Sequence, residues 1–421
     1  MNLSTKQLAI IGGVVLLLVI GVLVFTLGKQ ASTVGAPQLT VWGVDKSDSF
    51  NAISGLFAKA VRGAKITYVQ KPEANYEENL IKALAAGVGP DVFYISNRSL
   101  PKMKDVLVPV DSTKFTTTNL TNLFPTAAGQ DFVYKGSIYA LPLNIDALVM
   151  FYNRDIFDRA AVANPPVTWE EFQADVPKLR VLNDKGQITT AAAAIGGSNK
   201  TVAYASDILS LLMLQNGVSM PSSASPEARF SDAKGVAALD FYTQFTNPAS
   251  QAYTWNESET ASLDNFSAGG VAVVFGYRSD AELINRKNQF LKYGVAPVPQ
   301  LSAGSSVNYP KYWGLAVSKQ SANYSGAWDF IQFATTNTEA LNAYAAATNN
   351  LPALKTYINY NLNDKDYGVL ANEALSARSW WIPDAGQVDG ILNSAILRVI
   401  SGVANVSQSL REAQDGVNQI R

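Results

Sequence analysis

The side chains that could carry chemistry in this sequence are carboxylates and aromatic rings at the ends of predicted elements. Four aspartates share such a position: Asp45, Asp146, Asp264 and Asp384. A carboxylate there can bind a polyol, and two that face each other across a cleft can hydrolyse a glycoside. The pairs Glu77/Glu78 and Glu170/Glu171 fall instead in first helical turns, where they favour the helix dipole. The aspartates leave binding and hydrolysis both open.

Aromatic residues narrow the ligand class. Of the seven tryptophans, Trp169 and Trp328 fit the apolar faces of predicted helices. The other five lie at element ends or in loops: Trp42, Trp255, Trp313, Trp380 and Trp381. Flat rings stack on the C–H faces of sugars, while Asp, Asn and Arg side chains bind the hydroxyls. A sugar site is one interpretation of these rings, and ordinary packing in a core or between domains is the other.

Histidine and cysteine are both absent from the 421 residues, which excludes several kinds of catalysis. Without a thiol or an imidazole, the protein cannot build a Cys/His zinc site, an iron–sulfur cluster, a disulfide framework or a Ser-His-Asp triad. Acid–base work would fall to Asp, Glu, Lys or Tyr. Oxygen ligands could still hold calcium or magnesium. We predict that the protein uses neither a cofactor nor a metal.

The charges are few and balanced. The chain has 33 Lys+Arg and 34 Asp+Glu, a net charge of −1, and only 16% charged residues. The basic stripe that nucleic-acid binding usually needs is missing, so we predict no nucleic-acid partner. The length predicts two or three domains.

From Pro37 onward, short apolar runs alternate with amphipathic helices. We predict strands at 38–42, 64–69 and 92–95 and helices at 48–61 and 75–87. This order is typical of an α/β layer with a parallel sheet. Ligands bind beyond the carboxyl ends of the strands in such sheets, which favours the residues after Trp42 and after Ile95.

Caps and later runs extend the pattern. Asn75 is a candidate N-cap, Gly87 suits a left-handed C-terminal position, and Thr168 with Glu171 predicts a capping box. Further strands are expected at 147–152, 270–275, 292–298 and 312–317. Further helices are expected at 169–182, 207–215, 232–245, 324–334, 338–346, 389–400 and 406–420.

The N-terminus reads as a membrane anchor. Residues 8–27 hold no charge over 20 positions, which as a helix spans roughly 30 Å, the thickness of a bilayer's hydrocarbon core. A cleaved signal peptide is the alternative, but its apolar run would be shorter and would precede a small-residue cleavage site. We therefore predict an uncleaved anchor at 1–30, a tether at 31–37 and a soluble domain on the extracytoplasmic side of the cell membrane.

Four motifs, in this order, point to one family: AGVGPDVF, YALP, FYNRD and PPVTWEEF. Together with YWGLAVSK and NNLPALK, they resemble the extracellular solute-binding proteins of carbohydrate ABC transporters, the maltose-binding-protein-like family 1. The resemblance runs from about Leu39 to Ile420. It implies a two-lobe α/β fold of the periplasmic-binding-protein (Venus flytrap) type. Lobe 1 would hold 38–145 plus 296–349, and lobe 2 would hold 146–295 plus 350–421.

The resemblance also implies ligand-binding residues. They follow the first strand, the PDVF strand and the hinge, or match aromatic positions of the family: Asp45, Lys46, Asn97, Arg98, Asp146, Tyr277, Trp313, Trp380 and Trp381. Trp42 is a further ligand-binding candidate because of its own position at the end of the first strand. Tyr277 stands where many sugar binders have tryptophan, which weakens an assignment to maltodextrins. The acylated cysteine usual in the family is missing, and the apolar N-terminus would replace it as the anchor.

These features together predict a membrane-tethered, monomeric solute-binding protein. It would capture a carbohydrate between its lobes and deliver it to the permease subunits of an ABC transporter, without catalysis. Two other functions stay open. The first is a surface glycoside hydrolase that uses two carboxylates, and the second is a sensor or a binding protein for a solute other than a sugar.

Overall fold

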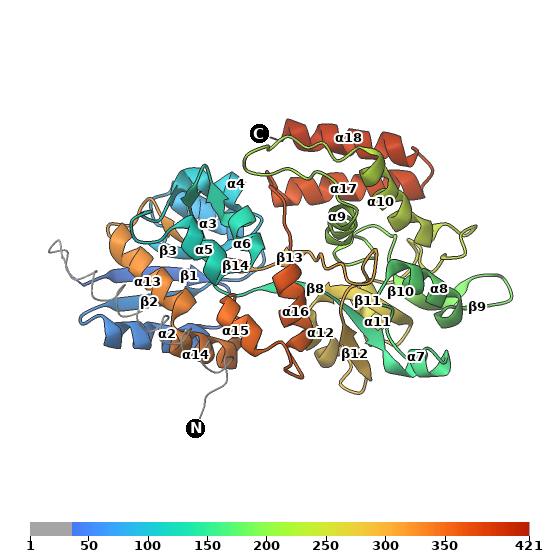
Figure 1. Cartoon of the computed structure of the whole chain (residues 1–421), viewed down its shortest axis with the longest axis horizontal. Coiled ribbons are helices and arrows are strands. Elements are labelled where there is room, and N and C mark those ends of the chain that lie inside the picture. Colours follow the sequence, from blue (N-terminus) through green and yellow to red (C-terminus); the bar gives the residue numbers. More distant parts are fainter. Residues whose placement is uncertain (1–35, 421) are drawn as a thin grey trace, which may run out of the picture.

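Two β-sheets, each covered by helices, lie side by side and form two lobes (Figure 1). The computed structural model describes residues 36–420 of the chain. The predicted anchor at 1–30 and nearly all of the predicted tether lie outside the described residues. Between residues 36 and 420, no helix is long and apolar enough to cross a membrane.

The first sheet confirms the strand–helix–strand order predicted for the start of the domain. Its strands are β1 (Gln38–Gly43), β2 (Lys65–Gln70), β3 (Val92–Ser96), β4 (Leu107–Val108), β7 (Ala140–Pro142) and β14 (Trp313–Ser318). The order is β2-β1-β3-β14-β4, and β7 also pairs with β14. Strand β1 is parallel to β2 and β3, as expected, but β14 is antiparallel to β3. The sheet is therefore mixed, and the loops after β1 and β3 lie at the same edge.

The second sheet is also mixed. It contains β8 (Asp146–Asn153), β9 (Val181–Leu182), β10 (Ile188–Ala194), β11 (Val271–Tyr277), β12 (Tyr293–Ala296) and β13 (Pro310–Lys311). The order is β12-β8-β11-β10-β9, and β13 pairs with the start of β8. Strand β8 is antiparallel to both of its long neighbours, β11 and β12. The end of β11 therefore lies beside the start of β8, where the chain enters this lobe.

Helices cover both sheets and complete two separate hydrophobic cores. The first core includes α2 (Ser47–Ala60), α3 (Tyr76–Ala85), α4 (Leu100–Met103), α5 (Thr117–Leu123), α6 (Thr126–Phe132), α13 (Tyr324–Thr336), α14 (Thr338–Thr348), α15 (Lys355–Tyr360) and α16 (Gly368–Ser376). The second includes α7 (Arg154–Arg159), α8 (Trp169–Leu179), α9 (Ala205–Gln215), α10 (Ala233–Thr243), α11 (Ser262–Ser267), α12 (Asp280–Lys287), α17 (Ala385–Ile400) and α18 (Val406–Gln419). Trp255 is fully buried in the second core, so its ring is explained by packing.

The structure confirms two of the three predictions made for the helix ends. The capping box of α8 is present, with Thr168 accepting from the Glu171 backbone and Glu171 accepting from the Thr168 backbone. Gly87 adopts a φ of +73°, as its predicted position requires. The prediction for Asn75 is wrong, because its side chain makes no capping bond to α3. Asn75 is itself left-handed, at φ 59°, whereas a capping residue normally has extended backbone.

The chain passes between the two cores three times. Core membership changes between Ala147 and Leu148, between Tyr309 and Tyr312, and between Ala377 and Trp380. The predicted lobe ranges, with crossings near 145, 295 and 350, concern the two bodies that would move against each other on ligand binding. They stay a prediction.

The buried Asn308 links the three crossing segments. Its side-chain amide donates to the Leu148 carbonyl at 2.7 Å, and its own carbonyl accepts from the Arg378 backbone at 2.8 Å. We call this group of contacts the Asn308 junction. Because Asn308 bonds to both of the other crossing segments, the position of each segment depends on the positions of the other two.

Candidate ligand-binding cleft

A cavity of about 520 Å³ lies between the two lobes. The first lobe contributes the loop after β1, the loop after α14 and Trp313, and the second contributes Tyr204 and the loop after β11. The crossing segments form the floor with Asn144, Asp146 and Lys311. Most of the lining side chains are polar or aromatic, with a few aliphatic ones such as Val44, Ile145 and Leu351 among them, so the cavity suits a ligand with many hydroxyl groups.

Asp45 is the best-supported carboxylate on the first-lobe side. Its side chain accepts from the Tyr94 hydroxyl at 2.8 Å and from the Tyr344 hydroxyl at 2.9 Å. Burial raises the pKa of Asp45, and the two tyrosine bonds partly oppose that rise. The tyrosines fix the carboxylate in one orientation at the cavity wall, which is what a hydrogen-bonding group needs in order to select a ligand.

Asp146 holds the loop that follows β11. Its carboxylate accepts from the Arg278 and Ser279 backbone amides, both at 3.1 Å. It also accepts from the Ala147 amide at 2.8 Å. Burial raises the pKa of Asp146 to about 6, although these bonds favour the charged form. Both oxygens are thus engaged with the backbone, so Asp146 positions the loop that carries Arg278.

Arg278 connects the lobes on one side of the cavity. Its guanidinium donates to the Asn349 carbonyl at 3.1 Å and to the Asn349 side chain at 3.4 Å. It also lies over the Tyr367 ring, 4.3 Å from the ring centre. Arg278 belongs to the second lobe, whereas Asn349 and Tyr367 pack with the first.

Tyr204 and Asp280 form the second-lobe wall, next to Lys311 of the floor. The Tyr204 hydroxyl donates to Asp280 at 2.9 Å, and the Lys311 ammonium lies 5.3 Å from the centre of the Tyr204 ring. Tyr204 has a φ of 60°, which is unusual for a residue with a large side chain. Such strained positions cluster at functional sites, where surrounding contacts hold them.

Two ion-pair clusters join the lobes beyond the cavity. Arg98, which follows β3, pairs with Asp207 at 3.4 Å and with Asp389 at 2.5 Å. Lys102 pairs with Glu77 and, across the lobes, with Asp384, both at 3.0 Å. We call the Arg98 pairs the interlobe latch. The Arg98 side chain is only 14% exposed, so solvent screens these pairs less than surface pairs.

The residues expected to bind ligand divide into two groups. Asp45, Lys46, Asp146 and Trp313 line the cavity. The other six lie outside its lining: Trp42, Asn97, Arg98, Tyr277, Trp380 and Trp381. Their role in binding stays a prediction.

Each of these six residues has its own surroundings. Asn97 donates to Asp131 at 3.3 Å, Tyr277 donates to Asp207 at 2.8 Å, and Trp381 stacks on Tyr134. The Lys71 ammonium lies over the Trp42 ring, 3.7 Å from the ring centre. Trp380 is buried and its indole nitrogen has no partner among the described residues, as is also true of Arg98 Nε. Unpaired buried donors are groups that a water molecule can satisfy.

Sequence reasoning missed several lining residues. Arg278 and Asp280 lie within three residues of Tyr277, at the end of β11, so the rule that placed ligands beyond strand ends could have found them. Tyr204 and Lys311 gave no local signal, because only the packing of α9 and β13 brings them to the cavity.

The fold and a family comparison define the class of protein. The family model for bacterial extracellular solute-binding proteins matches residues 54–367, most of the chain. The chain therefore belongs to this family. The resemblance inferred from the sequence motifs is confirmed, and so is the two-lobe α/β fold.

Individual relatives are distant in sequence. The maltotriose-binding protein of Pyrococcus abyssi is 23% identical over 78% of this chain and 69% of its own length. The galactooligosaccharide-binding protein of Bacillus subtilis is 24% identical over 90% of this chain and 88% of its own. A cyclo/maltodextrin-binding protein solved with maltotetraose superposes with a TM-score of 0.76, at 20% identity, over 92% of this chain and 98% of that structure. The cyclic α-maltosyl-1,6-maltose-binding protein of Arthrobacter globiformis gives 0.75, at 18% identity, over 92% and 99%.

Proposed function

We propose that this protein captures a carbohydrate between its two lobes and delivers it to an ABC permease. The observation that carries the proposal is the cavity between the lobes, where Asp45, Trp313 and Asp280 surround one space. Two relatives are named for binding maltotriose and galactooligosaccharide. A ligand that touches both lobes at once favours the closed arrangement, and a permease can recognise that arrangement.

The chemistry of the wall favours a neutral polyol. Asp45, Asp280 and Glu282 accept hydrogen bonds, Lys46 and Lys311 donate them, and Trp313 offers a flat face. The lining holds acids and bases together, so neither an anion nor a cation finds a field of one sign. A sugar ring has hydroxyls for both kinds of group and C–H faces for the indole.

The test is a titration of the purified protein with a library of mono- and oligosaccharides. Calorimetry measures the heat of binding, and fluorescence reports changes around the seven tryptophans, of which Trp313 lines the cavity. We expect saturable binding of at least one sugar. Peptides, polyamines and oxyanions are titrated in parallel. Binding of one of these, with none of any sugar, would replace the proposed ligand class.

We also propose that residues 8–27 anchor the protein in the membrane, with the lobes on the extracytoplasmic side. The basis is their length and lack of charge. Membrane fractionation and mass spectrometry of the mature N-terminus test this. A mature chain that starts near Ala31 or Pro37 would show cleavage and release instead.

A glycoside hydrolase is the weaker alternative. Burial raises the pKa of Asp146 to about 6, as a general acid requires, but its oxygens already accept from three backbone amides. We propose that the protein therefore binds without catalysis. Chromogenic glycosides test the point directly, and hydrolysis that disappears in Asp146→Asn would favour the enzyme.

A further inference from the structure

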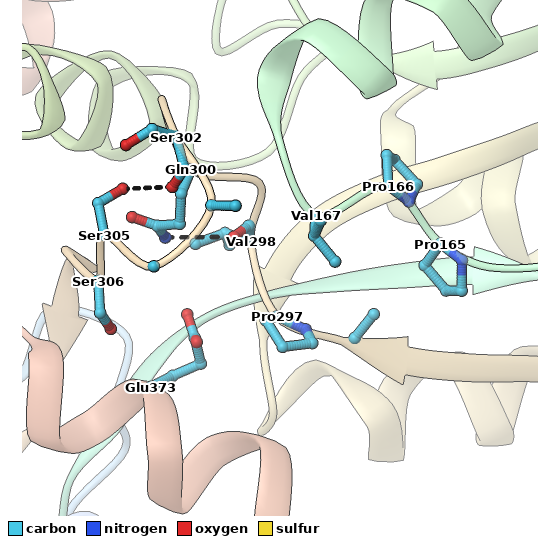
Figure 2. Close-up of a pocket in the computed structure, with 13 residues that line it drawn as sticks. Pro165, Pro166, Val167, Pro297, Val298, Gln300, Ser302, Ser305, Ser306 and Glu373 are labelled. Carbon is cyan, nitrogen blue, oxygen red and sulfur yellow. Dashed lines mark hydrogen bonds between the residues drawn. The ribbon is translucent and has the colours of Figure 1, made fainter.

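A second cavity, of about 400 Å³, lies where α16 meets the second lobe (Figure 2). Its walls are residues 165–167, residues 296–298, the loop at 300–306 and Glu373 of α16. None of these residues lines the cleft between the lobes. Its volume falls in the range of small-molecule sites, about 300–1,000 Å³. The cavity is thus a separate space, large enough for a small ligand.

Gln300 holds the loop that roofs this cavity. Its side-chain oxygen accepts from the Val307 backbone at 3.0 Å, and its amide donates to the carbonyls of Val298 and Val307 at 3.2 Å. Within the loop, the Ser305 hydroxyl donates to the Ser302 carbonyl at 2.7 Å. Because the two ends of the loop are joined through this one part-buried amide, the roof is built into the fold, while residues 302–306 remain exposed at its rim.

Glu373 is the only ionisable residue in the lining of this cavity. It is 5% exposed, and its carboxylate accepts from the Asn308 side chain. Figure 2 shows the side chain directed from α16 into the space between Pro297 and Ser306. Among residues 36–420, no lysine or arginine forms a salt bridge with it. Burial raises the pKa of Glu373 to about 7, and no neighbouring charge contributes to the shift.

A buried carboxylate without a counter-charge favours a cationic ligand. A cation beside it recovers the electrostatic energy that burial removes. Pro165, Val167 and Pro297 offer apolar surface, and the serines of the loop offer oxygen atoms. A primary ammonium group has three donors for such oxygens, and a short alkyl chain would cover the apolar wall.

We propose that this cavity binds a small primary alkylammonium ion, whose charged group pairs with Glu373 and whose chain lies against Pro165, Val167 and Pro297. The ion would be one hydrogen bond away from the Asn308 junction, since Glu373 accepts from Asn308. The site is independent of the sugar cleft, so the failure of either proposal leaves the other standing.

The experiment is a calorimetric titration of the full-length protein with propylammonium and butylammonium chloride. The neutral alcohols of the same chain length serve as ligand controls. We expect saturable binding of the ammonium ions and none of the alcohols. In Glu373→Gln, which keeps an acceptor for Asn308, affinity should fall at least tenfold. The matched control is Glu339→Gln, an exposed glutamate on α14, which should bind as the parent does.

The parent protein supplies a second readout that needs no variant. Its affinity should fall by up to about tenfold for each pH unit below 7, because the protonated carboxyl loses its charge. Binding that is independent of pH between 5 and 8, or equal binding of butylammonium and butanol, would overturn the proposal. The proposal would also be overturned if the Glu373→Gln variant folds and binds the ammonium ions with the affinity of the parent.

Discussion

At the scale of single residues, buried carboxylates concentrate where the two lobes meet. Asp131, Asp146, Asp207 and Glu373 all lie at or near the crossing segments, and burial raises the pKa of each. These groups hold protons more tightly in the folded chain than in the unfolded one. They therefore make the folded state less stable as pH rises, whereas an acid that is paired with a cation on the surface makes it more stable.

Asp131 allows that dependence to be measured. Burial raises its pKa to about 7, whereas an unfolded aspartate titrates near 3.9. As pH rises from 5 to 7, the parent should therefore lose stability relative to Asp131→Asn, by about 1.4 kcal/mol per unit. Urea-denaturation curves of both proteins at several pH values measure this difference. The amide keeps an acceptor for the Tyr312 and Asn97 donors. A difference that stays constant with pH would contradict the assignment.

Trp313 should matter to the ligand more than to the fold. It lines the cleft and makes an edge contact with Tyr76. Loss of one aromatic face typically costs about 0.5–1.5 kcal/mol, so Trp313→Ala should weaken sugar binding by roughly two- to tenfold. Tyr360→Ala, which removes a ring that is 89% exposed, should leave the affinity unchanged. Calorimetry with the sugar found by titration compares the two, and equal affinities would exclude Trp313 from the site.

The sequence predicted part of this site and could not have predicted the rest. Asp45 and Lys46 follow the first strand directly, so a local rule located them at the cavity. Tyr204 and Lys311 depend on contacts between segments about a hundred residues apart. The interlobe latch depends on three separate segments, 98, 207 and 389, which no local pattern relates.

At the scale of elements, local periodicity was a sound guide to helices and strands but not to how they pair. The strands at 38–42, 64–69 and 92–95 and the helix after Thr168 were predicted from spacing alone. Strand β14 was predicted as a strand too, yet its place between β3 and β4 was not. Its antiparallel direction follows from the crossing near 312, which is a property of the whole chain.

The capping box of α8 gives a prediction at this scale. Thr168→Ala removes the acceptor for the Glu171 amide, which lies 3.2 Å away. The free energy of unfolding should fall by about 1 kcal/mol, as for other lost N-caps. Urea denaturation monitored by circular dichroism measures the loss. The control is Thr118→Ala in the first turn of α5, an exposed threonine that is not the cap residue. Equal stability of Thr168→Ala and the parent would mean that the cap contributes nothing.

At the scale of the whole molecule, we expect the interlobe latch to hold the two lobes together when no ligand is present. Arg98→Met would leave Asp207 and Asp389 without the cation that pairs with both of them. Breaking a buried pair by removing one partner typically costs roughly 3–5 kcal/mol, so the closed arrangement should weaken. Small-angle scattering of the ligand-free protein should show a larger radius of gyration. Arg229→Met, an exposed arginine paired with Glu227, is the matched control. Identical scattering of Arg98→Met and the parent would show that the latch does not hold the lobes.

The position of β14 has a consequence for how the chain is made. This strand lies in the middle of the first sheet, yet it is residues 313–318 of the sequence. A ribosome releases the chain from its N-terminus, so β3 must wait with an open edge until most of the polypeptide has emerged. Pairing over such a separation is slow, because loop closure precedes any gain from contacts. The nascent first lobe thus stays incomplete through most of synthesis, which is the condition a translocation channel needs in order to thread it unfolded.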